Sequence, residues 1–80
     1  MAAKLGRVCR DARTQAGLRL IDIALEADVS QGTVHYFERG DWWIGKTDAI
    51  VDAYARLCGV PALELWHAAL REAEHDRRPG

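Results

Sequence analysis

The stretch from residue 23 to residue 40 has the pattern of two short helices joined by a tight turn. Its first half carries apolar residues with the spacing of one helix face, namely Ile23, Ala24 and Ala27. Asp28 suits the left-handed conformation that such a turn needs, because a short polar side chain tolerates a positive φ. Ser30 is a favourable N-cap for the helix that follows. The pattern therefore predicts a helix-turn-helix.

The second helix of this pair separates its apolar and polar side chains. Val34 and Phe37 recur at i and i+3 and are expected to face the core, while Gly40 suits the position just after a helix end. The positions left outside carry mostly short or polar side chains, namely Gln31, Gly32, Thr33, His35 and Tyr36. A helix with this layout fits the major groove of DNA.

The remaining residues predict three more helices and no sheet. Helices are expected at about residues 3–16, 20–27, 30–39, 48–58 and 61–73. Thr47 is the expected N-cap of the fourth helix, and Pro61 suits the first position of the fifth. No stretch alternates with period two. We therefore expect a compact all-α domain of five helices over residues 1–73, with the helix-turn-helix at 20–39, followed by a polar, frayed tail at 74–80.

These residues resemble the helix-turn-helix domain of Cro and the lambdoid phage repressors, also called the Xre family. The resemblance runs from Leu5 to about Trp66, and is most specific in Ala-Asp-Val-Ser-Gln-Gly-Thr-Val (27–34) and Phe-Glu-Arg-Gly (37–40). It implies a sequence-specific DNA-binding transcriptional regulator, most simply a small phage-type repressor. It also implies an ion pair between Arg13, near the end of the first helix, and Glu38, near the end of the recognition helix.

The exposed side of the recognition helix supplies candidates for DNA contact. The amide of Gln31 offers a donor and an acceptor that match adenine N6 and N7, although a solvated helix end is the alternative. Further candidates for base readout are Gly32, through close backbone approach, Thr33 and Tyr36. A phosphate contact or surface packing is the alternative for Tyr36. The candidates for contact with the DNA backbone are Arg19, Ser30, His35, Arg39, Lys46 and Thr47.

The start of the second helix departs from the family pattern. Family members usually have Ser or Thr as the cap there, followed by Gln, whereas this chain has Arg19, Leu20 and Ile21. The departure removes a cap and one DNA contact, and we expect it to expose two apolar side chains. It supports an alternative function, a helix-turn-helix module that binds another protein and has lost DNA binding.

Apolar residues outside the helix-turn-helix are candidates for a homodimer interface, namely Trp42, Trp43, Ile44, Trp66 and Leu70. One of the adjacent tryptophans is expected to pack over the core. The other is expected to lie against the DNA backbone or in the interface, where tryptophan is enriched. For Trp66 and Leu70 the alternative is that they only cover the core.

Charge argues against strong non-specific DNA binding. The chain has 11 basic and 12 acidic residues, a net charge of −1, whereas DNA-binding domains are usually basic. The first 19 residues differ, because five of them are basic, namely Lys4, Arg7, Arg10, Arg13 and Arg19, and one is acidic, Asp11. We therefore expect base contacts and dimerisation on a double-stranded operator to contribute much of the affinity.

Length and motifs exclude several other classes of protein. Eighty residues suffice for one small domain, without a catalytic second domain. The sequence has no nucleophile elbow or phosphate loop, so we do not expect an enzyme. Cys9 and Cys58 lack the paired spacing of a metal site and are expected to be small buried hydrophobes. We expect no cofactor and no small-molecule ligand. With no apolar run long enough for a membrane span, we expect a cytoplasmic chain.

Overall fold

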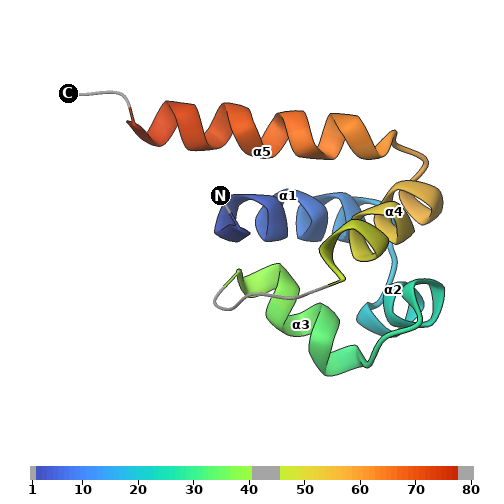
Figure 1. Ribbon diagram of the computed structural model, residues 1–80. Helices are drawn as coiled ribbons and strands as arrows, with labels where there is room; N and C mark the ends of the chain where they lie inside the picture. The colour runs from blue at the N-terminus through green and yellow to red at the C-terminus, as the bar shows by residue number, and fades with distance from the viewer. Residues whose placement is uncertain (1, 41–45, 78–80) are drawn as a thin grey trace.

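The computed structural model describes residues 2–40 and 46–77, and it arranges them in five α-helices (Figure 1). The helices are α1 (Ala2–Gln15), α2 (Leu20–Ala27), α3 (Gln31–Arg39), α4 (Thr47–Cys58) and α5 (Ala62–Arg77). Within these two ranges there is no strand, which confirms the predicted all-α fold. Trp42, Trp43 and Ile44 lie outside the described residues.

The turn between α2 and α3 has the predicted geometry. Asp28 has a φ of 58°, and among the described residues it is the one non-glycine position with positive φ. The N–H of Val29 donates to the carbonyl of Ala24, which closes the end of α2. The hydroxyl Oγ of Ser30 accepts from the N–H of Thr33 at 3.1 Å, so it caps α3 as expected.

The core forms where α1 crosses the other helices. Figure 1 shows α1 between α5 on one side and α3 on the other, and α1 contacts both of them. The largest side chains that are fully buried come from α1, α2, α3 and α4, namely Cys9, Ile23, Val34, Ile50, Val51 and Tyr54. These contacts hold the helix-turn-helix against a scaffold of three further helices.

The helices α4 and α5 begin at other residues than predicted. Thr47 is the first residue of α4 rather than its cap, and Lys46 stands at the cap position without a capping side-chain hydrogen bond. Pro61 precedes α5, and its carbonyl accepts the N–H groups of Glu64 and Leu65. Proline therefore begins the turn that leads into the helix, without belonging to the helix itself.

The C-terminal helix is longer than predicted. It continues past Ala73 to Arg77, through a stretch that contains no glycine or proline. Its buried residues are Leu65 and Ala69, whereas Leu63 and Leu70 are 64% and 48% exposed. Leu63, Trp66, Leu70 and Ala73 form a second apolar face, of which only Trp66 packs partly on the core.

A close contact between α1 and the end of α3 depends on Gly6. A Cβ atom at this position would lie 2.3 Å from the carbonyl oxygen of Phe37 and 2.6 Å from that of Glu38. Both atoms belong to the backbone, so neither can rotate away. The glycine, which costs a helix some stability, therefore allows the two helices to touch.

We expect Gly6→Ala to destabilise the fold by about 1–3 kcal/mol, because α1 or the end of α3 must shift. The matched control is Gly32→Ala in α3, where a Cβ would meet only Ser30 Oγ at 3.9 Å. This control should gain roughly 0.5–1 kcal/mol from the better helix former. Urea denaturation of both variants measures the difference, and equal effects would contradict the close helix contact.

Candidate nucleic-acid interface

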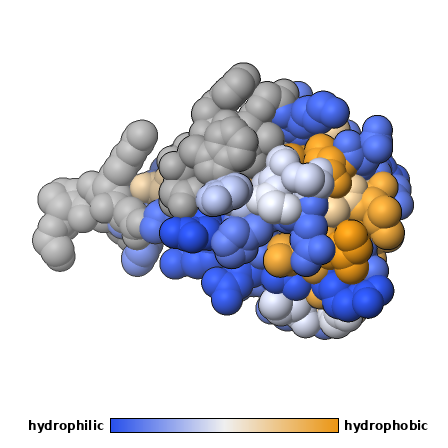
Figure 2. All heavy atoms as spheres, turned by 90° about the horizontal axis from the view of Figure 1, so that it is seen from below, coloured by the Kyte–Doolittle hydropathy of each residue, from blue (hydrophilic) through white to orange (hydrophobic). Residues whose placement is uncertain are grey.

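One side of α3 is open to solvent over most of its length. Exposed positions are Gln31, Gly32, His35, Tyr36 and Arg39, whereas Thr33 is half-buried. Figure 2 views the molecule from the side on which α2 and α3 lie, where hydrophilic side chains cover much of the surface and hydrophobic ones gather over α2. The structure thus exposes five of the ten predicted DNA contacts along α3.

The first turn of α3 is held in place by its own hydroxyl groups. Ser30 Oγ and Thr33 Oγ1 lie 2.7 Å apart and share a hydrogen bond, in addition to the capping bond to the Thr33 N–H. Both hydroxyls therefore order the helix start. Gln31 and Gly32 lie between them in sequence and are exposed. The capping bond joins Ser30 and Thr33, so it does not involve the Gln31 side chain.

Two aromatic rings lie side by side further along α3. His35 and Tyr36 contact each other edge to face, with ring centroids 5.6 Å apart and planes at 63°. Tyr36 is 45% exposed. The contact restricts both side chains, although their roles at a base edge or a phosphate stay predictions.

A buried polar cluster ties α3 to α1 and α4. Arg13 Nε and Nη2 donate to Glu38 Oε2 and Oε1 at 2.7 and 3.0 Å, so the pair expected between these residues is present and bidentate. Arg13 Nη1 also donates to the carbonyl of Leu18 at 2.9 Å. The side chains of Arg13 and Glu38 are only 14% and 7% exposed. Solvent therefore screens this ion pair weakly.

Tyr54 of α4 is the third member of this cluster. Its hydroxyl donates to Glu38 Oε2 at 2.5 Å, and its side chain is fully buried. Burial, followed by the hydrogen bond to Glu38, raises the pKa of Tyr54 well above its usual range. A tyrosine on the buried face of a helix needs a partner for its hydroxyl, and that requirement was the available sign of a polar cluster.

We expect Arg13→Ala to lower the free energy of unfolding by about 3–5 kcal/mol, since it leaves the Glu38 carboxylate buried without a cation. The matched control is Arg56→Ala, which removes an arginine that is 55% exposed and paired with Glu26. That loss should stay below about 1 kcal/mol. Chemical denaturation compares the two variants, and similar losses would contradict a structural role for the Arg13–Glu38 pair.

The start of α2 has a substitute for the missing family cap. The Asp22 carboxylate accepts from the backbone N–H of Arg19 at 2.8 Å and from its guanidinium Nη2 at 3.1 Å. These hydrogen bonds lower the pKa of Asp22. Arg19 is exposed, so this ion pair is open to exchange with a phosphate.

The expected exposure of Leu20 and Ile21 was wrong. Both side chains are half-buried and pack against the core, because α2 turns them toward its neighbours. Leu25, in the same helix, is instead 75% exposed. Leu25, rather than Leu20 or Ile21, therefore supplies the exposed apolar surface on α2.

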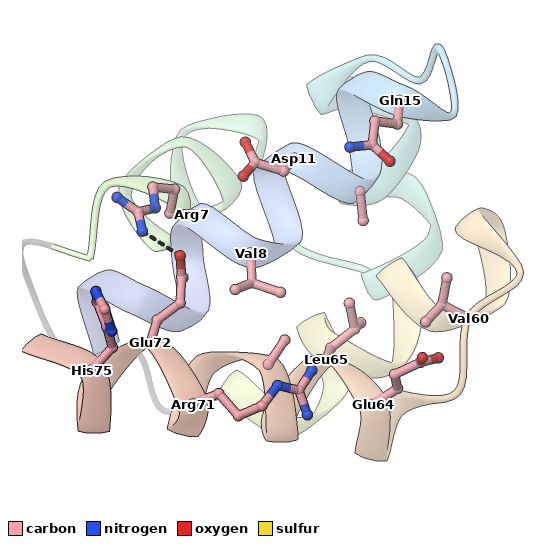
Figure 3. Close-up of a pocket in the computed structure, with 12 residues that line it drawn as sticks. Arg7, Val8, Asp11, Gln15, Val60, Glu64, Leu65, Arg71, Glu72 and His75 are labelled. Atoms are coloured by element: carbon pink, nitrogen blue, oxygen red, sulfur yellow. Dashed lines mark hydrogen bonds and ion pairs between the residues drawn. The ribbon is translucent and has the colours of Figure 1, made fainter.

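A separate groove of about 560 Å³ lies between α1 and α5 (Figure 3). Its rim mixes charges of both signs, and Figure 3 shows Arg7 of α1 paired with Glu72 of α5. The other carboxylate oxygen of Glu72 is buried without a hydrogen-bond partner. Because its charges are mixed, this groove does not favour an anion over a cation.

Within residues 2–40 and 46–77, no three His, Cys, Asp or Glu side chains are grouped to hold a metal ion. Burial raises the pKa of the Cys9 thiol to about 12, and Cys58 is half-buried. None of the described helices combines the length and the hydropathy that a bilayer span requires.

The fold is that of a known regulator structure. It is similar to the crystal structure of the clp gene regulator ClgR from C. glutamicum, with a TM-score of 0.72 and 21% sequence identity. The similarity covers 89% of this chain and 90% of that chain. No protein-family model and no curated protein matches the sequence. The comparison supports the helical fold along nearly the whole length of both chains.

Proposed function

We propose that this protein is a sequence-specific, double-stranded DNA-binding transcriptional regulator that inserts α3 into the major groove. The observation that carries the proposal is the first turn of α3, which is capped by Ser30 and leaves Gln31 and Gly32 exposed. A capped helix start that presents an amide to solvent is suited to a bidentate contact with adenine. The structural similarity to a protein named as a gene regulator supports the same class.

Gly32 gives this proposal a second line of support. Glycine inside a helix costs roughly 1 kcal/mol relative to alanine, and the space around Gly32 is open. The fold itself therefore has no steric need for glycine here, in contrast to Gly6. A close approach of the α3 backbone to DNA would supply that need.

The remaining roles follow from the positions around α3. We assign base contacts to Gln31, Gly32, Thr33 and Tyr36, and backbone contacts to Arg19, Ser30, His35, Arg39, Lys46 and Thr47. The cluster of Arg13, Glu38 and Tyr54 holds α3 at a fixed angle to α1 and α4, so we assign it to positioning. In this proposal the protein is a small repressor of the phage type, within the Xre family.

Binding of a specific duplex should depend steeply on salt, because each phosphate neutralised contributes about −0.9 to the log–log slope. Selection from random duplex DNA followed by titration at several salt concentrations measures this. Gln31→Ala should cost about 1–3 kcal/mol on the selected site and relax the preference at one base position. Its matched control, Lys46→Ala, should weaken specific and random duplexes alike.

Three results would overturn these assignments. If no duplex is recovered by selection, the proposed function is wrong. If Gln31→Ala and Lys46→Ala both lose affinity equally for all duplexes, Gln31 contacts the DNA backbone rather than a base. The Gly32→Ala variant should bind the selected duplex less tightly, although its fold is more stable. Unchanged affinity would contradict a close approach of the α3 backbone to DNA at Gly32.

We further propose that the protein acts as a homodimer. Leu63 and Leu70 are exposed on α5 and form an apolar stripe with the half-buried Trp66, and such a stripe suits a self-complementary contact. A net charge of −1 provides little non-specific affinity, so a second recognition helix would contribute much of the binding.

We expect two chains per duplex when the selected site contains two half-sites, and Leu70→Glu should weaken this assembly by introducing charge into the interface. Sedimentation of the protein with and without the duplex measures the stoichiometry. Leu25→Glu is the matched control, since it places the same charge on α2. One wild-type chain per duplex at saturation would exclude the homodimer.

A protein-binding module without DNA affinity is the second candidate function. The observation in its favour is Leu25, which is 75% exposed in a helix whose other apolar residues are buried or half-buried. Failure of the selection described above would favour this function, and Leu25→Glu would then be the first variant to test for loss of a partner.

A further inference from the structure

The junction between α1 and α3 concentrates positive charge. Four cationic residues follow one another along α1 at intervals of three, namely Lys4, Arg7, Arg10 and Arg13. This spacing keeps them on neighbouring positions around the helix. His35 and Arg39 of α3 lie on the other side of the junction. In a chain with a net charge of −1, this is a strongly polarised surface.

Two adjoining hollows follow this junction. One of about 270 Å³ is lined by Arg10, His35 and Arg39, together with Arg13, Leu20 and Glu38. The other, of about 350 Å³, is lined by Lys4, Arg7, Arg10, Glu38 and Arg39. Arg10 and Arg39 border both hollows, so they lie at the centre of the surface.

Glu38 is the acidic residue in both linings, and it contributes little repulsion toward an anion. Both of its carboxylate oxygens accept hydrogen bonds from Arg13, and Oε2 also accepts from Tyr54. Its side chain is only 7% exposed. The other polar side chains that line the two hollows are arginine, lysine and histidine.

We infer that the α1–α3 junction is a phosphate-binding site centred on Arg10, with His35 and Arg39 as its partners from α3. This inference rests on the proposed function, because His35 and Arg39 belong to the helix that would enter the groove. The ligand is a backbone phosphate of the DNA strand that borders the major groove entered by α3. The guanidinium of Arg10 offers a planar, two-pronged donor that matches phosphate oxygens.

Arg10 is suited to this role by its surroundings. It is exposed, and it makes no ion pair with the described residues, whereas Arg7 in the next turn is paired with Glu72. Its contact would carry no information about base sequence, because phosphates are common to all duplexes. The site would thus extend the DNA footprint from α3 onto α1.

The test compares Arg10→Gln with Arg71→Gln, which removes the same charge from an exposed position on α5. Arg10→Gln should weaken binding to the selected duplex and to random duplex by the same factor, roughly five- to tenfold at 0.1 M salt. It should also reduce the salt slope by about 0.9. Arg71→Gln should change neither quantity, and equal melting temperatures of the variants exclude misfolding. Unchanged affinity and slope for Arg10→Gln, or an equal loss for Arg71→Gln, would overturn the inference while leaving the proposed function intact.

A second arm uses inorganic phosphate alone, followed by the NMR resonances of the His35 ring. Phosphate should shift these resonances in the wild type, and the shift should be lost in Arg10→Gln. If phosphate binds in this way but no duplex does, the junction is a site for free phosphate groups and the proposed function is wrong. If phosphate causes no shift in the wild type and Arg10→Gln keeps its DNA affinity, the inferred site does not exist.

Discussion

The hydrogen-bonded cluster of Arg13, Glu38 and Tyr54 is the constraint on which the arrangement of the helices depends. Glu38 lies near the end of α3 and receives donors from α1 and α4. An unpaired carboxylate at this depth would be costly, so the three helices must meet with their polar groups in register. Any other angle of α3 would leave at least one of these groups without a partner. The direction in which Gln31 and Tyr36 point is therefore determined from the far end of the helix.

This arrangement separates the residues that stabilise the fold from the exposed ones along one short helix. Val34 and Phe37 face the core and Glu38 holds the polar cluster, whereas Gln31, Gly32 and His35 are exposed. The exposed side makes few demands on the fold, as the open space around Gly32 illustrates. Substitutions there can alter the surface that α3 presents while the scaffold stays the same.

Much of the fold could be predicted because local chemistry decides it. The left-handed Asp28, the cap at Ser30 and the glycine at residue 40 each act within a few residues, and all three have the expected conformation. For α5 the sequence left open which side faces the core, since that helix has two apolar stripes. Which stripe faces the core depends on how closely α5 can pack on α1, and the small side chain of Ala69 permits a close contact.

The candidate site was less predictable than the fold. The pairing of Arg13 with Glu38 was implied by resemblance to a family, whereas the participation of Tyr54 depends on the angle between α3 and α4. The charged junction around Arg10 also went unrecognised. It forms only when α1 and the end of α3 come together, and no spacing within one segment encodes that contact.

The contact at Gly6 would have a consequence for the entropy of the proposed DNA binding. Because backbone touches backbone there, no side chain with alternative rotamers separates α1 from α3. The two helices are expected to move as one rigid body, which would carry the charged residues of α1 and the exposed residues of α3 together. Docking of such a body orders few internal degrees of freedom, since that ordering has already occurred on folding. More of the free energy of the new contacts would then appear as affinity.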